Sequence, residues 1–212
     1  MEAFKVPSQP VGQYDISQNI RSMIKPHSID DIFRNLKRPK YSERVVFVFS
    51  GGGNRGAAQI GMLYTLMEKE MLPDIILGSS VGALNGVAFA CTPTFATVEK
   101  LDSLWRGLQK EDVFPPHRFG STWRYAQRRS HVFPNQGLSD LILSNIEIFD
   151  LSETAMPVEI VLTRHSDGVA VRVSSGDALS LLLASSALPG TFPPIEINSE
   201  LYIDGGIADD VP

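Results

Sequence analysis

The stretch Pro73–Leu84, with the sequence PDIILGSSVGAL, decides the fold of this chain. A short run of β-branched residues and leucine ends at Gly78, and a pattern of small residues typical of a helix begins at Val81. Ser80 lies at this junction, with Gly78 and Gly82 two residues away on either side, in the pattern Gly-x-Ser-x-Gly. Such a strand–turn–helix junction exposes the serine hydroxyl, and the N-terminus of the helix directs N–H groups to the same point. We therefore expect Ser80 to be a nucleophile.

Strand and helix patterns alternate around this junction. Val45–Ser50 is a continuous apolar run, typical of a strand buried on both faces of a parallel sheet. Apolar residues follow at helical spacing from Ala57 to about Glu70, and again over Phe95–Leu108. The alternation predicts an α/β domain with a mostly parallel sheet.

The second half of the chain predicts two helices, a hairpin and a final short strand. The helices are expected at Leu138–Ile148 and Ala178–Ser186, the hairpin at Val158–Leu162 and Val169–Val173, and the strand at Glu200–Ile203.

Residues 112–136 interleave aromatic side chains with arginines and follow no single period. One interpretation is a mobile cover, or a surface that meets lipid headgroups. The other is an irregular connection whose aromatic rings pack into the core. The sequence leaves both interpretations open.

The composition excludes several classes of protein. A chain of 212 residues can bury a core without disulfides or metals, and a net charge of -5 argues against a nucleic-acid binder. The single cysteine, Cys91, excludes an intrachain disulfide and a thiolate metal cluster. Neither a signal peptide nor a membrane-spanning stretch is evident, so we expect a cytoplasmic protein whose membrane contact is at most peripheral. Residues 1–43 are expected to form an arm with a short helix, and residues 44–212 the folded domain.

A serine hydroxyl needs a base before it can attack a carbonyl. The order Ser, acid, His of the α/β-hydrolases is not available here, because no histidine follows Asp204. A carboxylate can act as the base where its surroundings raise its pKa toward the working pH. Asp204 follows an apolar strand and precedes two glycines, which makes it the candidate, although Asp-Gly-Gly alone is also typical of a simple turn.

The segment Gly51–Gly56, hereafter the glycine loop, connects a predicted strand to a predicted helix. Bare backbone amides at such a place are suited to stabilise an oxyanion. The same residues fit the dinucleotide fingerprint G-x-G-x-x-G, but that motif needs an acid at the end of the second strand, where Gly78–Ser80 stands. A phosphate-binding P-loop would need Lys and Ser or Thr in place of Ala57 and Ala58. An oxyanion hole is therefore favoured, with dinucleotide binding as the weaker alternative.

Four separated motifs, taken in order, resemble a patatin-like phospholipase domain. They are Gly51–Gly56, Gly78–Gly82, Ala184–Pro194 and Asp204–Gly206, and the resemblance spans roughly Arg44 to Pro212. It implies a three-layer α/β/α fold with a mostly parallel central sheet. It also implies a Ser–Asp dyad that hydrolyses acyl esters of phospholipids or other lipids, without a metal or cofactor.

The resemblance assigns a role to each motif residue. Ser80 would be the nucleophile and Asp204 the base. The oxyanion hole would include Gly51, Gly52, Gly53, Arg55, Gly56 and Val81, with Arg55 steadying the loop, and the supporting glycines would be Gly78, Gly82, Gly205 and Gly206.

Two features depart from the family pattern. The family usually has asparagine before the final Val-Pro, whereas this chain has Asp210, and negative charge near Asp204 is expected to raise the pKa of that carboxyl. Members commonly continue well past this proline, so we expect either a fragment or a domain without the layer that backs the last strand. A catalytically inactive, lipid-binding member of the fold would keep the same sequence pattern and remains an alternative.

Overall fold

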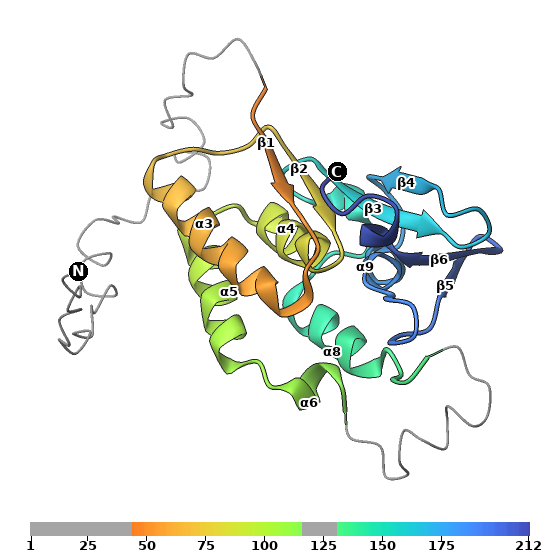
Figure 1. Ribbon diagram of the computed structural model, residues 1–212. Coiled ribbons are helices and arrows are strands. Elements are labelled where there is room, and N and C mark those ends of the chain that lie inside the picture. Colours follow the sequence, from red (N-terminus) through yellow and green to blue (C-terminus); the bar gives the residue numbers. More distant parts are fainter. Residues whose placement is uncertain (1–43, 116–130) are drawn as a thin grey trace, which may run out of the picture. The chain divides into compact units, whose positions relative to one another are not determined.

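The computed structural model describes residues 44–115 and 131–212 (Figure 1). The predicted arm (1–43) and the centre of the aromatic segment (116–130) lie outside these residues.

The described residues contain one mixed sheet with the order β1-β2-β3-β6-β5 and with β4 paired to β3. The first three strands are parallel, and β4, β5 and β6 extend the sheet with antiparallel pairs. This arrangement confirms the α/β class and the parallel centre. The strands are β1 (Val46–Phe49), β2 (Ile75–Ser79), β3 (Val158–Arg164), β4 (Ala170–Val173), β5 (Ile195–Ile197) and β6 (Glu200–Asp204).

The predicted helices fall close to their expected ranges, and the short helix α6 was not predicted. Helix α4 packs on β1, β2 and β3, α3 and α5 pack beside it, and α9 packs on β3, β5 and β6. Helix α8 lies between α6 and α9 (Figure 1). The bounds are α3 Gly56–Glu68, α4 Val81–Cys91, α5 Phe95–Gly107, α6 Lys110–Val113, α8 Gln136–Asn145 and α9 Ala178–Ser185.

The core lies between these helices and one face of the sheet. Phe47 and Phe49 of β1 share this face with Ile76 of β2 and with Ile160 and Leu162 of β3, and all of them are buried. The predicted hairpin is confirmed as β3 and β4. Strand β5 was not predicted, because its three residues are too few to show a period; it pairs with β6 across a turn at Asn198-Ser199.

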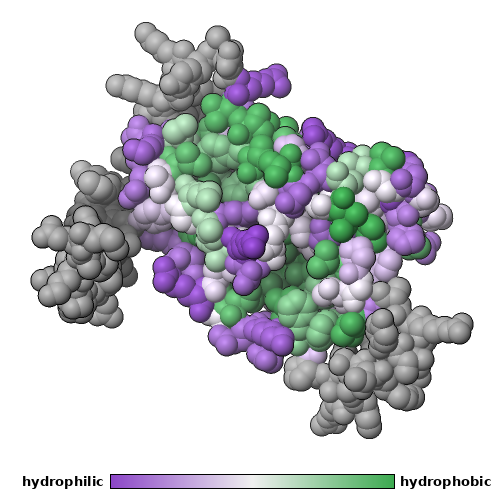
Figure 2. All heavy atoms as spheres, viewed as in Figure 1, coloured by the Kyte–Doolittle hydropathy of each residue, from purple (hydrophilic) through white to green (hydrophobic). Residues whose placement is uncertain are grey.

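The prediction that the first strand is buried on both faces is wrong. Val46 and Val48 are 42% and 44% exposed, whereas Phe47 and Phe49 between and beyond them are buried. Among the described residues β1 pairs with β2 alone, so it is an edge strand. Its other face is exposed because the described helices pack on the face that carries Phe47 and Phe49. Because the residues on both faces of this strand are apolar, the sequence shows no alternation that would distinguish the buried face from the exposed one. Figure 2 shows the resulting apolar surface over β1 and β2.

The close approach of α4 to the sheet depends on Gly82. A Cβ added at Gly82 would collide with the carbonyl of Phe49 on β1, whereas one added at Gly61, on the exposed side of α3, would meet nothing within 4 Å. Gly82→Ala should therefore lower the free energy of unfolding by about 1–3 kcal/mol. Gly61→Ala, the control, should raise it by about 0.5–1 kcal/mol, because alanine favours the helix. Urea denaturation measures both, and a fully stable Gly82→Ala protein would show that α4 is not pressed against β1.

Candidate active site

Ser80 occupies a strained turn between β2 and α4. Its backbone angles, φ 53° and ψ −126°, lie in a region that residues with a side chain rarely adopt. Gly78 and Gly82 permit the turn, since a Cβ at Gly78 would lie 2.7 Å from the Cα of Ala83. This is the geometry expected of a nucleophile at a strand–helix junction.

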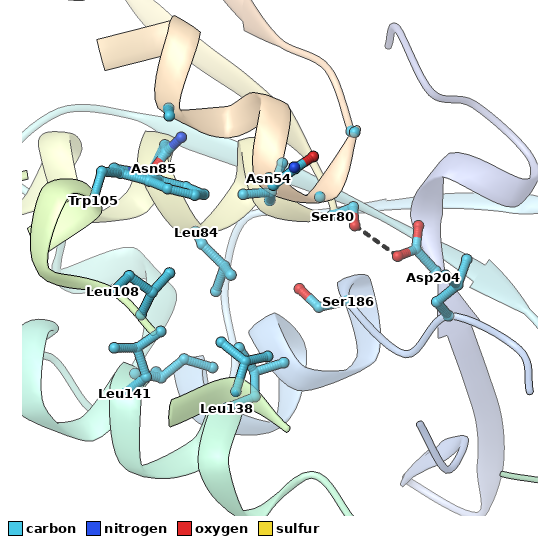
Figure 3. A pocket seen from close by; sticks show the side chains of 18 of the residues that line it. Asn54, Ser80, Leu84, Asn85, Trp105, Leu108, Leu138, Leu141, Ser186 and Asp204 are labelled. Carbon is cyan, nitrogen blue, oxygen red and sulfur yellow. Dashed lines mark hydrogen bonds between the residues drawn. The ribbon is translucent and has the colours of Figure 1, made fainter. Parts of the chain in front are cut away.

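Ser80 and Asp204 meet because two strands end at the same place beside β3. In the register of the sheet, the last residue of β2, Ser79, pairs with Val161, while Asp204 at the end of β6 pairs with the next residue, Leu162. Strand β2 is parallel to β3 and β6 is antiparallel to it, so the two chains arrive from opposite directions. The Ser80 hydroxyl donates a hydrogen bond to Asp204 Oδ2 at 2.6 Å (Figure 3).

Asp204 is a buried carboxylate, only 4% exposed. Burial raises its pKa above the ordinary aspartate value, and the negative charge of Asp210 acts in the same direction. Hydrogen bonds from the Ser80 hydroxyl and from the Gly206 N–H, the latter at 2.8 Å, oppose this rise because they stabilise the ionised form. The surroundings therefore give Asp204 the raised pKa that a base acting on a serine requires.

The turn after α9 holds both members of the pair. Ser185 Oγ accepts a hydrogen bond from the Ser80 N–H at 3.0 Å and donates one to the Val161 carbonyl at 2.8 Å. Two residues later, the carbonyl of Ala187 accepts the N–H of Asp204 at 3.0 Å. The sequence analysis placed these residues in the motif Ala184–Pro194 but predicted no individual role for any of them.

The glycine loop passes beside Ser80. Gly52 and Gly53 have φ values of 136° and 57°, which glycine adopts without strain. Within the described residues their N–H groups, and that of Val81, have no hydrogen-bond acceptor. The N–H of Gly51, by contrast, is bound to Asp210 Oδ1 at 3.0 Å. Of the predicted oxyanion donors, Gly52, Gly53 and Val81 are thus free to bind a substrate oxygen, and Gly51 is engaged.

The surroundings of the other two residues predicted for the oxyanion hole, Arg55 and Gly56, do not suit an oxyanion donor. Arg55 is exposed, and its side chain makes no hydrogen bond or ion pair with the described part of the chain. Gly56 is buried at the start of α3, where a Cβ would lie 2.5 Å from Val81 Cγ2 and 2.8 Å from the ring of Trp105. Gly56 therefore serves the packing of α3 against α4 and α5.

A buried polar network behind the loop was missed by the sequence reasoning. Asn85, 3% exposed, donates to the Gly56 carbonyl at 3.0 Å and to Gln59 Oε1 at 2.8 Å, and accepts the indole N–H of Trp105 at 3.0 Å. Gln59 in turn donates to the Ser50 carbonyl at 2.7 Å. The network ties both ends of the glycine loop to α4 and α5. A lone asparagine among the small apolar residues of α4 was the available signal.

A cavity of about 1000 Å³ opens beside the Ser80–Asp204 pair (Figure 3). Polar groups of the glycine loop and of Ser80, Ser186 and Asp204 lie at one end of it. Its walls are mainly apolar and come from α4, α5, α6, α8 and the segment after α9: Leu84, Ala88, Leu101, Leu104, Trp105, Leu108, Val113, Phe114, Leu138, Leu141, Ile142, Ile146, Leu188 and Phe192. The shape and polarity suit a molecule with an apolar chain and a reactive polar end.

The described ends of the aromatic segment 112–136 pack inside the protein. The ring of Phe114 stacks on Phe192 at 5.5 Å between centroids and tilts against Phe133 at 4.9 Å. These two residues follow the packed interpretation. The cover interpretation concerns residues 116–130, which lie outside the described part.

In residues 44–115 and 131–212, no group of three or more His, Cys, Asp or Glu side chains is placed to hold a metal ion. None of the helices described is long and apolar enough to cross a membrane.

Ser185 and Ser186 are adjacent buried serines with different hydrogen bonding. Ser185 bonds on both sides, whereas the hydroxyl of Ser186 faces the cavity with no partner among the described residues. Ser185→Ala should lower the free energy of unfolding by about 1–3 kcal/mol, because it leaves buried partners unsatisfied. Ser186→Ala should be neutral or stabilising. Thermal denaturation of both variants compares them directly, and equal losses would contradict the bonding described.

Comparison with known proteins identifies the relatives of this chain. Residues 47–212 match the family described as Patatin-like phospholipase. A lysophospholipase NTE1 of Candida glabrata is 29% identical over 199 residues, which cover 88% of this chain and 10% of the relative. A patatin-like phospholipase domain-containing protein of Caenorhabditis elegans, ZK370.4, is 30% identical over 192 residues, covering 85% of this chain and 13% of the relative.

The chain therefore spans only about a tenth of the length of these curated relatives. Among solved structures, VipD from Legionella pneumophila has a TM-score of 0.57 at 15% identity, covering 80% of this chain and 47% of VipD, a likeness of fold. The fold agrees with the family match, which extends from β1 to the last residue. This chain belongs to the patatin-like phospholipase family.

Proposed function

We propose that this chain is a lipid acyl hydrolase that cleaves carboxylic esters through a Ser80–Asp204 dyad. The observation that carries the proposal is the 2.6 Å hydrogen bond from a strained serine to a buried aspartate in the lining of a mainly apolar cavity. The names of the relatives, lysophospholipase and patatin-like phospholipase, support a lipid ester as the substrate.

The first half of the reaction forms an acyl-enzyme. Asp204 takes the proton of the Ser80 hydroxyl as Ser80 Oγ attacks the ester carbonyl. The N–H groups of Gly52, Gly53 and Val81 stabilise the oxyanion that forms. Asp204 then returns the proton to the departing alcohol oxygen as the ester bond breaks.

In the second half, water replaces the alcohol. Asp204 takes a proton from the water as it attacks the acyl carbonyl, and the proton passes to Ser80 Oγ when the fatty acid leaves. The apolar walls of the cavity, such as Leu84, Leu138 and Leu141, hold the acyl chain and exclude bulk water from the reacting atoms. Contact with the membrane that supplies the lipid is peripheral in this proposal.

Labelling with a fluorophosphonate, read by intact-mass spectrometry, tests the nucleophile. The wild type should gain one adduct, and Ser80→Ala none, because the alanine has no oxygen to attack phosphorus. Asp204→Asn should be labelled at least about 10³-fold more slowly, since the amide cannot take the serine proton. Folding of each variant is checked by circular dichroism.

The labelling experiment also separates the alternatives. A folded wild type without any adduct would contradict the proposal and favour an inactive lipid-binding member of the fold. Measurable binding of NAD or ATP in a titration would favour the dinucleotide alternative for Gly51–Gly56.

The pH dependence of hydrolysis reports on Asp204. The ionised carboxylate is the base, and burial favours its protonated form, so activity should be lost as the pH falls through a raised pKa. The acid limb of kcat/KM for a soluble ester should therefore lie above about pH 4, the ordinary aspartate value. Circular dichroism over the same range excludes unfolding as the cause. Activity that stays level down to about pH 3 would contradict Asp204 as the base.

A further inference from the structure

Asp210 reaches back from the segment after β6 to the glycine loop. Its Oδ1 accepts the N–H of Gly51 at 3.0 Å, and its backbone carbonyl accepts the same N–H at 3.3 Å. A Cβ added at Gly51 would collide with this Oδ1, and one added at Gly206 would lie 2.8 Å from it. The carboxylate of Asp210 is thus packed between Gly51 and Gly206.

Each of these two glycines neighbours one member of the dyad. Gly51 opens the glycine loop and lies next to Ser80, since its added Cβ would be 3.4 Å from Ser80 Cβ. Gly206 donates its N–H to Asp204 Oδ1 at 2.8 Å. Asp210 therefore joins the loop that carries the proposed oxyanion donors to the turn that holds the base.

Asp210 also supplies charge to the site. The other polar groups that the described residues place against Asp204 are neutral: the Ser80 hydroxyl, the Gly206 N–H and the Thr163 hydroxyl, which bonds the Asp204 carbonyl. The adjacent carboxylate, Asp209, faces Arg172 on β4 at 3.3 Å. Among the charged groups of the described residues, Asp210 is the one that acts on the pKa of Asp204, and it raises that pKa.

We propose that Asp210 is a positioning residue that fixes the glycine loop against the catalytic turn and adds negative charge beside the base. The inference rests on the proposed function for its catalytic consequence, but the contact itself does not. The two contributions are separable, because asparagine keeps a side-chain oxygen that accepts the Gly51 N–H and lacks the charge, whereas alanine lacks both and keeps only the longer bond from the Gly51 N–H to the backbone carbonyl.

Three variants test the proposal: Asp210→Asn, Asp210→Ala and, as the control, Asp209→Asn. The rate of fluorophosphonate labelling is measured against pH for each. Asp210→Asn should keep the plateau rate within about twofold and move the acid limb to lower pH by several tenths of a unit, because a nearby negative charge is removed. The displacement should shrink in about 1 M salt, which screens charges on exposed side chains.

Asp210→Ala should show the same displacement and, in addition, a plateau rate about tenfold or more below the wild type, since the donors are no longer held in place. Asp209→Asn should match the wild type in both respects. Equal plateau rates and acid limbs for the wild type and both Asp210 variants would overturn the proposal, as would an Asp209→Asn loss equal to that of Asp210→Ala.

Hydrogen exchange read by mass spectrometry tests the contact without catalysis. Peptides that contain Gly51–Gly53 should exchange faster in Asp210→Ala than in the wild type, with Asp210→Asn and Asp209→Asn unchanged. If the wild type is not labelled at all, the proposed function fails and the exchange result alone decides the contact. Unchanged exchange in a folded Asp210→Ala protein would overturn it.

Discussion

The site depends on two strands that end at one point. Two strands pair with the same edge of β3, one after the other. Strand β2 pairs as far as Val161, and the oppositely directed β6 pairs from the next residue, Leu162. Neither strand could extend by a residue without displacing the other, so the chain must turn away sharply at both ends. The turn at Ser80 and the turn after Asp204 are the two results, and the hydrogen bond between the two side chains follows from where the strands stop.

This arrangement costs stability, and the surrounding contacts offset the cost. A residue with a side chain at φ 53° is strained by about 1–3 kcal/mol, and a buried carboxylate has lost most of its hydration. The N–H of Gly206 and the hydroxyl of Ser80 satisfy Asp204, and Ser185 holds the strained backbone of Ser80. The features least favourable to folding are therefore those nearest to the atoms proposed to react, as is common at active sites.

Local signals in the sequence carried most of the fold and the central pair. The glycines around Ser80 predicted the turn, because steric exclusion acts between near neighbours in the chain. The sequence Asp204-Gly205-Gly206 taken alone is equally typical of a simple turn. Its place in an ordered set of motifs is what favoured Asp204 as the candidate base. Its burial and its bond to Ser80 depend on residues 124 positions apart, which no local pattern reports.

What the sequence did not predict depends on long-range neighbours. The exposure of Val46 and Val48 follows from the described helices, which pack on the opposite face of β1, the face of Phe47 and Phe49. The engagement of the Gly51 N–H follows from Asp210, 159 residues away in the chain. Asn85 belongs to no repeating pattern, and the partners of its side chain come from two other helices, α3 and α5. In each case the sequence shows which residue is present but not which distant residues it contacts.

The polar network behind the glycine loop holds a tryptophan, Trp105, whose fluorescence can report on the cavity. Trp105 is one of two tryptophans in the chain, and the other, Trp123, lies outside the described residues. The hydrogen bond to Asn85 fixes the indole N–H, while the ring lines the cavity. An apolar chain that enters the cavity replaces water along this ring without breaking the bond. We therefore expect the emission of Trp105 to change when the cavity is occupied, and a Trp123→Phe background would isolate that signal.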